Sequence, residues 1–143
     1  MIRGIFSFCL MCFLTISAQA LPLGEFQGKG SAMTLDWESP CSKIDVSLRR
    51  PSPEKLILSG GYHCGRVDKA WPKRVFRLEG DKVFWQGEEV GRYTEDLLRL
   101  LFEGGQYRIV IKRRKEGDFF FREMWANRRR FLLVEGELQR QDN

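Results

Sequence analysis

The chain has few of the residues that most enzymes and metal sites need. Its 143 residues include one histidine, His63, and four cysteines. No serine stands in the G-x-S-x-G setting of a hydrolase nucleophile, and no glycine-rich loop leads into a helical pattern as phosphate-binding loops do. Acidic pairs such as Glu88-Glu89 and Glu95-Asp96 fall in expected turns, where carboxylates are ordinarily solvated. We therefore expect a protein that is not an enzyme and that uses no cofactor.

Long apolar runs are absent after residue 20, and the single run before it has the layout of a leader. One positive charge, Arg3, precedes the apolar run Ile5 to Ile16, and Ala18-Gln19-Ala20 follows. This order is typical of a secretory signal and its cleavage site. A membrane-spanning helix needs roughly 17–25 apolar residues, which is longer than this run. We expect cleavage after Ala20 and a periplasmic or secreted product without a transmembrane segment.

Only two cysteines, Cys41 and Cys64, remain beyond the leader, which carries Cys9 and Cys12. In an oxidising compartment an even number of cysteines favours a disulfide, and two of them allow one intramolecular pairing. A thiolate metal site wants three or four ligands. The imidazole of His63 is expected on the opposite face of a strand from Cys64. We therefore expect one disulfide, no metal site and a single domain over residues 21–143.

The charge of the chain is mildly basic, with a formal net value of +5 that falls to +4 when Arg3 leaves with the leader. Such a balance favours anionic partners without identifying one. The strongest basic runs are Lys112 to Lys115, which contains Arg113 and Arg114, and Arg128-Arg129-Arg130. Consecutive hairpins of a meander point to opposite ends, so these runs do not form one continuous nucleic-acid stripe. Two interpretations stay open, namely solvated surface charge and contact with an anionic envelope surface.

Apolar residues alternate with polar ones along most of the chain, which is typical of half-buried strands. The clearest cases are Lys43 to Arg49 and Tyr107 to Lys112. Similar segments bounded by turn residues are Gly24 to Leu35, Leu56 to Tyr62, Arg74 to Leu78, Lys82 to Trp85, Glu89 to Tyr93, Phe119 to Trp125 and Phe131 to Leu138. These segments predict an all-β, antiparallel up-and-down meander of about 8–10 strands. We expect it to close into a barrel, because both terminal strands are otherwise exposed edges.

One segment, Thr94 to Phe102, fits two interpretations. Its first residue suits a helix cap and its leucines suit a helix. Leu98 and Leu100, however, alternate with Phe102 as they would in a strand. Because the Gly104-Gly105 turn leads directly into the strand at Tyr107, we favour a strand.

Three short segments carry a resemblance to a known group of folds. They are Leu23-Gly24-Glu25-Phe26-Gln27-Gly28-Lys29-Gly30, Val90-Gly91-Arg92-Tyr93-Thr94-Glu95-Asp96 and Val134-Glu135-Gly136-Glu137-Leu138-Gln139-Arg140. Together they resemble the small β-barrels of the calycin group, which includes lipocalins, fatty-acid-binding proteins and nitrobindin-like proteins. The resemblance implies a closed barrel that binds a small molecule. Haem-binding members use a histidine near the C-terminus, which this chain lacks, so no haem is implied.

The richest aromatic segment places Phe119, Phe121 and Trp125 on one face together with Glu123. The interior of an eight-stranded barrel is either filled by side chains or just wide enough for one small ligand. If this face is interior, Glu123 needs a partner such as Arg99 or Arg108, because burying a lone carboxylate is costly. If the face is exterior, Glu123 is solvated.

Two functions from different classes follow. In the first, the protein is an exported, non-enzymatic barrel that binds a small apolar or amphipathic ligand through Phe119, Phe121, Glu123, Trp125 and Arg108. In the second, the barrel is solidly packed, and basic rim loops carrying Arg113, Arg114 and Arg128 to Arg130 contact the envelope or a protein. An interior cavity favours the first function and a filled interior favours the second.

Overall fold

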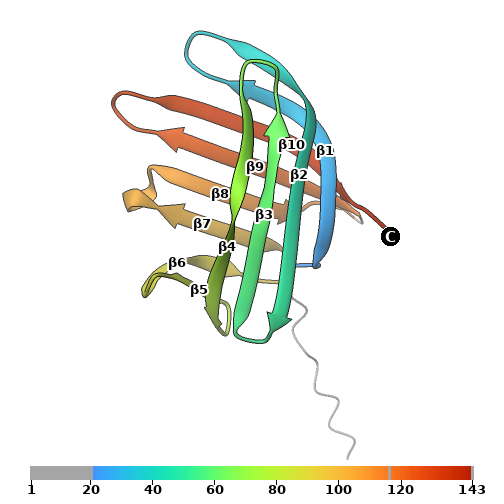
Figure 1. The fold of residues 1–143 in the computed structure, drawn as a ribbon, viewed down its shortest axis with the longest axis vertical. Coiled ribbons are helices and arrows are strands. Elements are labelled where there is room, and N and C mark those ends of the chain that lie inside the picture. The colour runs from blue at the N-terminus through green and yellow to red at the C-terminus, as the bar shows by residue number, and fades with distance from the viewer. Residues whose placement is uncertain (1–20, 116, 143) are drawn as a thin grey trace, which may run out of the picture.

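The computed structural model describes residues 21–115 and 117–142, so the expected signal peptide lies outside the described residues. Ten strands and one 3-10 turn make up the fold (Figure 1). In chain order they are β1 (Gly24–Met33), β2 (Glu38–Ser52), β3 (Lys55–His63), β4 (Asp68–Glu79), β5 (Lys82–Trp85), β6 (Glu88–Tyr93), β7 (Leu97–Phe102), η1 (Glu103–Gly105), β8 (Tyr107–Arg113), β9 (Asp118–Ala126) and β10 (Phe131–Arg140).

The strands form a closed antiparallel meander in which each strand pairs with its neighbours in sequence. The last strand closes the barrel against the first, with pairings that run from Phe26 opposite Arg140 to Met33 opposite Leu133. This confirms the expected barrel and its closure. The segment with two interpretations is also a strand, β7, which begins at Leu97.

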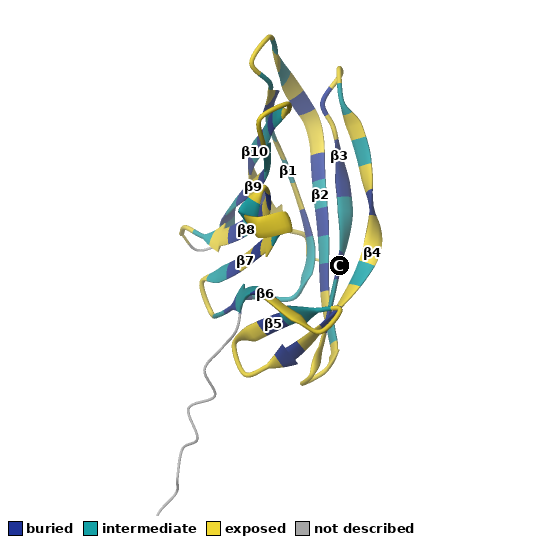
Figure 2. Cartoon of the chain, turned by 90° about the vertical axis from the view of Figure 1, so that its left-hand side faces the viewer, coloured by how far each residue is buried: buried dark blue, intermediate teal, exposed yellow. Residues whose placement is uncertain are grey.

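The core fills the inside of the barrel, because the apolar half of each alternating strand faces inward. Buried residues alternate with residues of intermediate exposure in the middle of β2, from Ile44 to Leu48, as Figure 2 shows. The largest side chains with less than 2 % exposure are Tyr62, Phe26, Phe76, Phe121, Leu21, Ile44, Leu48, Leu56, Leu98, Leu100, Ile109 and Ile111. One void at the centre, between Leu58, Trp71 and Ile109, measures only about 10 Å³.

Glycines in β1 permit the close approach of β10. A Cβ atom on Gly30 would lie 1.8 Å from the backbone oxygen of Glu135, and one on Gly28 would lie 1.8 Å from that of Glu137. Any larger residue would therefore push the two strands apart at the seam where the barrel closes. The glycine-rich composition of the first strand has this structural reason.

The two ends of the barrel differ. At one end the side chain of Leu21 is buried, its N–H donates to the Thr94 oxygen over 2.7 Å, and its oxygen accepts from the Tyr93 hydroxyl over 2.7 Å. Towards the other end, β4 and β5 diverge, because they pair only from Arg77 to Glu79. The first part of β4 therefore has β3 as its only strand neighbour within the described residues.

β4 is longer than the sequence indicates, since it begins at Asp68 and not at Arg74. Pro72 interrupts the alternation there, and proline is tolerated in a strand that has a neighbour on one side only. β2 likewise continues through Pro51 to Ser52, where a register shift against β3 accommodates it. Among the described residues, no helix has the length and apolarity needed to cross a bilayer.

Candidate functional site

A cleft of about 690 Å³ opens where β4 and β5 diverge. Aromatic side chains from four strands line it, namely Trp85, Phe102, Tyr107 and Trp125. The charged residues at its rim are Arg74, Arg108, Glu88, Glu89 and Glu103. The open space of this barrel is thus at its mouth, between the turn after β5 and the turn after β7.

Three of the aromatic rings form a stack across neighbouring strands. The ring centroids of Phe102 and Tyr107 are 5.6 Å apart, and those of Tyr107 and Trp125 are 4.3 Å apart, both in stacked orientation. The strand register explains the stack, because Phe102 is paired with Tyr107, and Tyr107 is paired with Trp125. Cross-strand partners lie close enough for their rings to touch. Tyr107 is buried, so Phe102 and Trp125, which are partly exposed, supply the accessible part of this aromatic wall.

The guanidinium of Arg74 faces this wall from β4. It lies 5.2 Å from the ring centroid of Phe102, 5.8 Å from that of Tyr107 and 5.9 Å from that of Trp85. None of the ion pairs in the described part of the chain involves Arg74. Aromatic faces attract a cation but leave its N–H donors without oxygen partners. Arg74 is therefore positioned to donate hydrogen bonds to an anionic group in the cleft.

Glu123 lies behind the stack and is the one charged residue that is fully buried among those described, at 1 % exposure. One carboxylate oxygen accepts from the Tyr62 hydroxyl over 3.1 Å and from the Lys69 ammonium over 3.0 Å. The other accepts from the Trp71 indole N–H over 2.6 Å. Three donors thus offset the cost of burying this carboxylate.

The sequence left open which face Glu123 occupies; the structure places it inside the barrel, and neither Arg99 nor Arg108 is its cationic partner. The partner is Lys69, whose side chain is 33 % exposed, while Arg108 lies outside and donates to the Gly105 oxygen. The other candidate, Arg99, is exposed. Lys69 can reach Glu123 because β4 begins at Asp68, which the sequence pattern did not reveal.

The buried carboxylate also affects the neighbouring phenols. Burial, followed by the charge of Glu123, raises the pKa of Tyr62 and of Tyr107 far above the ordinary value. Both hydroxyls are therefore neutral donors at physiological pH. The Lys69 ammonium lies 5.2 Å from the ring centroid of Tyr107, which connects the buried network to the wall of the cleft.

The other residues named from the sequence fall in three places. Trp125 and Arg108 line the cleft. Phe119 packs edge-on against Phe26 at 5.0 Å, and Phe121 packs against Trp71 at 5.5 Å, both within the core. The arginines of the two basic runs lie at opposite ends of the barrel. Arg113 and Arg114 are in or beside the turn between β8 and β9, and Arg128, Arg129 and Arg130 are in the turn between β9 and β10.

Sequence reasoning did not name four of the residues that line the cleft, Arg74, Trp85, Phe102 and Tyr107, nor Lys69, which pairs with Glu123 behind it. Phe102 and Tyr107 belong to recognised strands, so the pairing of their hairpin could have placed the two rings together. No signal identifies Arg74, because its setting depends on where β4 and β5 separate.

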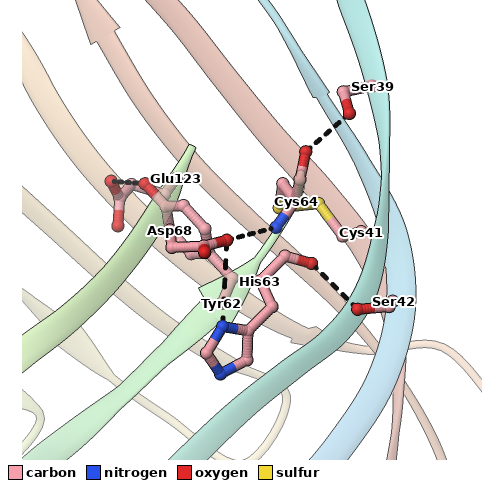
Figure 3. Close-up of a disulfide and its surroundings, with 8 residues drawn as sticks. All are labelled: Ser39, Cys41, Ser42, Tyr62, His63, Cys64, Asp68 and Glu123. Atoms are coloured by element: carbon pink, nitrogen blue, oxygen red, sulfur yellow. Dashed lines mark hydrogen bonds and ion pairs between the residues drawn. A yellow bond between two sulfur atoms is a disulfide. The ribbon is translucent and has the colours of Figure 1, made fainter. Parts of the chain in front are cut away.

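The disulfide joins Cys41 of β2 to Cys64 at the end of β3, as expected (Figure 3). The Ser39 hydroxyl donates to the Cys64 oxygen over 2.6 Å. His63 is exposed while Cys64 is buried, so the two side chains lie on opposite faces. Among the described residues, no three His, Cys, Asp or Glu side chains are grouped closely enough to hold a metal ion.

No protein-family model matches the chain, and no curated protein matches it in sequence. Three solved structures are similar to it. The siderocalin Ex-FABP, described as functioning through dual ligand specificities, has 10% identity and a TM-score of 0.44, covering 83% of this chain and 73% of that one. A protein of unknown function from the DUF3598 family of Nostoc punctiforme has 11% identity and a TM-score of 0.48, covering 86% of this chain and 50% of that one. This chain thus spans half the length of that protein.

The third structure is the S-type phycobiliprotein lyase of Guillardia theta, with 7% identity and a TM-score of 0.36, covering 85% of this chain and 88% of that one. These likenesses concern the fold alone. The closed ten-stranded barrel itself agrees with the architecture that the resemblance to calycin-like barrels implies.

Proposed function

We propose that the protein is a non-enzymatic binding barrel for a small amphipathic ligand that carries an anionic group. The ligand lies in the mouth cleft, with its apolar part against the stack of Phe102, Tyr107 and Trp125. Its anionic group meets Arg74, while the charge of Lys69 is already matched by Glu123. The observation that carries the proposal is the guanidinium of Arg74, which three rings surround and no carboxylate of the described chain neutralises.

The shape of the cleft supports a ligand of modest size. Sites for small molecules have volumes of roughly 300–1,000 Å³, mostly apolar walls and a few placed polar groups. The cleft measures about 690 Å³ and combines an aromatic wall with the guanidinium of Arg74, and its rim also carries Arg108, Glu88, Glu89 and Glu103. Because the centre of the barrel is filled, we assign the ligand to the mouth and not to the deep interior around Phe119 and Phe121.

The test uses 1-anilinonaphthalene-8-sulfonate, a planar aromatic probe with one sulfonate, and follows its fluorescence on titration. Arg74→Gln should weaken binding about ten-fold or more, since a hydrogen bond to a charged group contributes roughly 1.5–3 kcal/mol. Arg77→Gln is the matched control, because Arg77 lies on the outer face of the same strand over the ring of Phe84. Equal affinity of the two variants for the probe contradicts the proposal.

We also propose that the protein is exported through its N-terminal leader and is processed after Ala20. The sequence of the leader supports this, and a disulfide between Cys41 and Cys64 is compatible with an oxidising compartment. A periplasmic or secreted barrel would meet its small amphipathic ligand outside the cytoplasm.

A further inference from the structure

The turn between β1 and β2 presents apolar side chains to solvent. Leu35 at its apex is 86 % exposed, and Met33 beside it is 36 % exposed. The turn is well bonded, because the Thr34 N–H donates to the Trp37 oxygen over 2.9 Å and the Asp36 N–H donates to the Thr34 hydroxyl over 3.2 Å. The turn is thus held in place by hydrogen bonds, and it leaves the apolar side chain of Leu35 in solvent.

Arginines from two other turns lie at the same end of the barrel as this apex. Arg66, in the turn between β3 and β4, has its guanidinium 5.8 Å from the ring centroid of Trp37. Arg128, Arg129 and Arg130 occupy the turn between β9 and β10, and all three are exposed. β10 runs beside β1, with Leu133 paired to Met33, so this turn emerges next to the Leu35 turn (Figure 1).

The turn that carries the three arginines is also fixed. The side-chain oxygen of Asn127 accepts from the N–H groups of Arg129 and Arg130, each over 2.9 Å. None of the four arginines is in an ion pair with a carboxylate of the described residues. The acidic residues beside these turns are Asp36, Glu38 at the start of β2 and Asp68 at the start of β4, so four cations face three anions here.

We propose that this tip, defined as Met33, Leu35 and Trp37 with Arg66 and Arg128 to Arg130, docks the barrel on an anionic phospholipid surface. Leu35 and Met33 enter the outer edge of the acyl region, and Trp37 lies at the level of the headgroups, where amphipathic rings are favoured. The arginines donate to lipid phosphates, whose geometry suits the guanidinium fork. An apolar apex with unpaired arginines around it complements such a surface in both polarity and charge.

The other basic run lacks this combination. Arg114 pairs with Glu137 over 3.3 Å and lies over the ring of Phe120. Lys112 stands near the end of β8, at the end of the barrel opposite the tip. None of the exposed large hydrophobic residues of the described chain, which are Met33, Leu35, Val75 and Leu101, belongs to that hairpin. The anionic-surface role expected for both runs is therefore assigned to Arg128, Arg129 and Arg130 and not to Arg113 and Arg114.

The test is co-sedimentation of the chain from Leu21 to Asn143 with vesicles. All ten strands and their pairings lie between residues 24 and 140, so this chain contains the whole barrel. Vesicles of phosphatidylcholine with phosphatidylglycerol should bind the protein, and vesicles of phosphatidylcholine alone should bind it far less. Arg128→Glu with Arg129→Glu should weaken binding at least about 25-fold, since it both removes two attractive charges and adds two repulsive ones, and Leu35→Ser about ten-fold.

Two matched controls separate a defined docking site from general attraction by net charge. Lys112→Glu with Lys115→Glu makes the same change in charge at the opposite end, and Val75→Ser removes an apolar side chain that is 46 % exposed on β4. Both controls should bind as the parent chain does. Equal losses of binding for the two charge reversals would overturn the proposal. So would a parent chain that does not bind anionic vesicles, and that result would leave a protein partner as the occupant of the tip.

Discussion

At the residue scale, the buried carboxylate of Glu123 is tolerated because neighbouring side chains donate hydrogen bonds to it. Its carboxylate receives donors from three side chains, of which Lys69 alone reaches solvent. Removing one member of a buried pair leaves the others without partners in a low-dielectric interior. The sequence places Glu123 on an aromatic face but leaves open whether that face is interior or exterior. Its partners could not be anticipated, because they lie on β3 and β4, which are distant in sequence.

Glu123→Gln should lower the free energy of unfolding by about 3 kcal/mol, because it removes the charge that Lys69 and the two ring donors surround. Urea unfolding measures the change. Glu135→Gln is the matched control, since Glu135 accepts from Arg122 on the partly exposed outer face of the barrel. An exposed pair contributes less than about 1 kcal/mol. Equal effects of the two substitutions would contradict a structural role for the Glu123 network.

The three tyrosines of the chain, Tyr62, Tyr93 and Tyr107, should all resist ionisation while the barrel is folded. Burial is the largest cause that raises the pKa of each. A phenol whose pKa is higher in the folded than in the unfolded chain stabilises the fold below the unfolded pKa of about 10. This contribution declines as the pH rises above that value, because the unfolded chain then ionises first.

Ultraviolet absorbance at 295 nm, recorded during alkaline titration, follows the phenolates. The three groups should ionise together and in step with loss of the near-ultraviolet dichroism of the folded core. A tyrosine that titrates near pH 10 while the dichroism is unchanged would show that at least one phenol is accessible in the folded barrel.

At the scale of elements, the disulfide between β2 and β3 should contribute substantially to stability. Replacing both Cys41 and Cys64 by Ala should lower the free energy of unfolding by about 2–5 kcal/mol, as for native bridges in small secreted domains. Equilibrium unfolding of the variant and of the oxidised parent gives the difference. Titration of the unfolded parent that finds two free thiols would contradict the bridge.

The last strand should be indispensable, because β10 pairs with β9 on one side and with β1 on the other. A chain that ends before Phe131 leaves both neighbours as open edges and should fail to give soluble protein. Removal of Gln141 to Asn143 should have little effect, since within the described residues it costs the bond from the Gln141 N–H to the Glu25 oxygen, over 2.7 Å. Soluble yield and far-ultraviolet dichroism distinguish the two truncations, and a soluble, strand-rich product from the shorter chain would contradict the closure argument.

Most strands could be predicted because alternation with a period of two is a local signal. Lys82 to Trp85 was placed with its observed bounds, and β7 was recognised from Leu98, Leu100 and Phe102. The first part of β4 was missed because Pro72 and its charged neighbours give no alternation. The cleft was missed for a different reason: it depends on register and on the separation of β4 from β5, which are set by the whole barrel.

At the scale of the whole molecule, the barrel has a plugged end, a filled centre and an open mouth. Leu21 closes the first, and the cleft with its aromatic stack occupies the last. The charged residues at the mouth end fall into two groups. Glu88, Glu89 and Glu103 stand at the rim of the cleft, and Arg66 and Arg128 to Arg130 belong to the turns of the tip.

The central claim is that the mouth cleft holds an anionic amphiphile, and native mass spectrometry of the exported protein tests it most directly. The spectrum of protein purified from its own host should show a chain that begins at Leu21 and carries one anionic small molecule. Arg74→Gln should lose this molecule and Arg77→Gln should retain it. Bare masses for the parent and for both variants, before and after addition of 1-anilinonaphthalene-8-sulfonate, would contradict the assignment of the cleft as a ligand site.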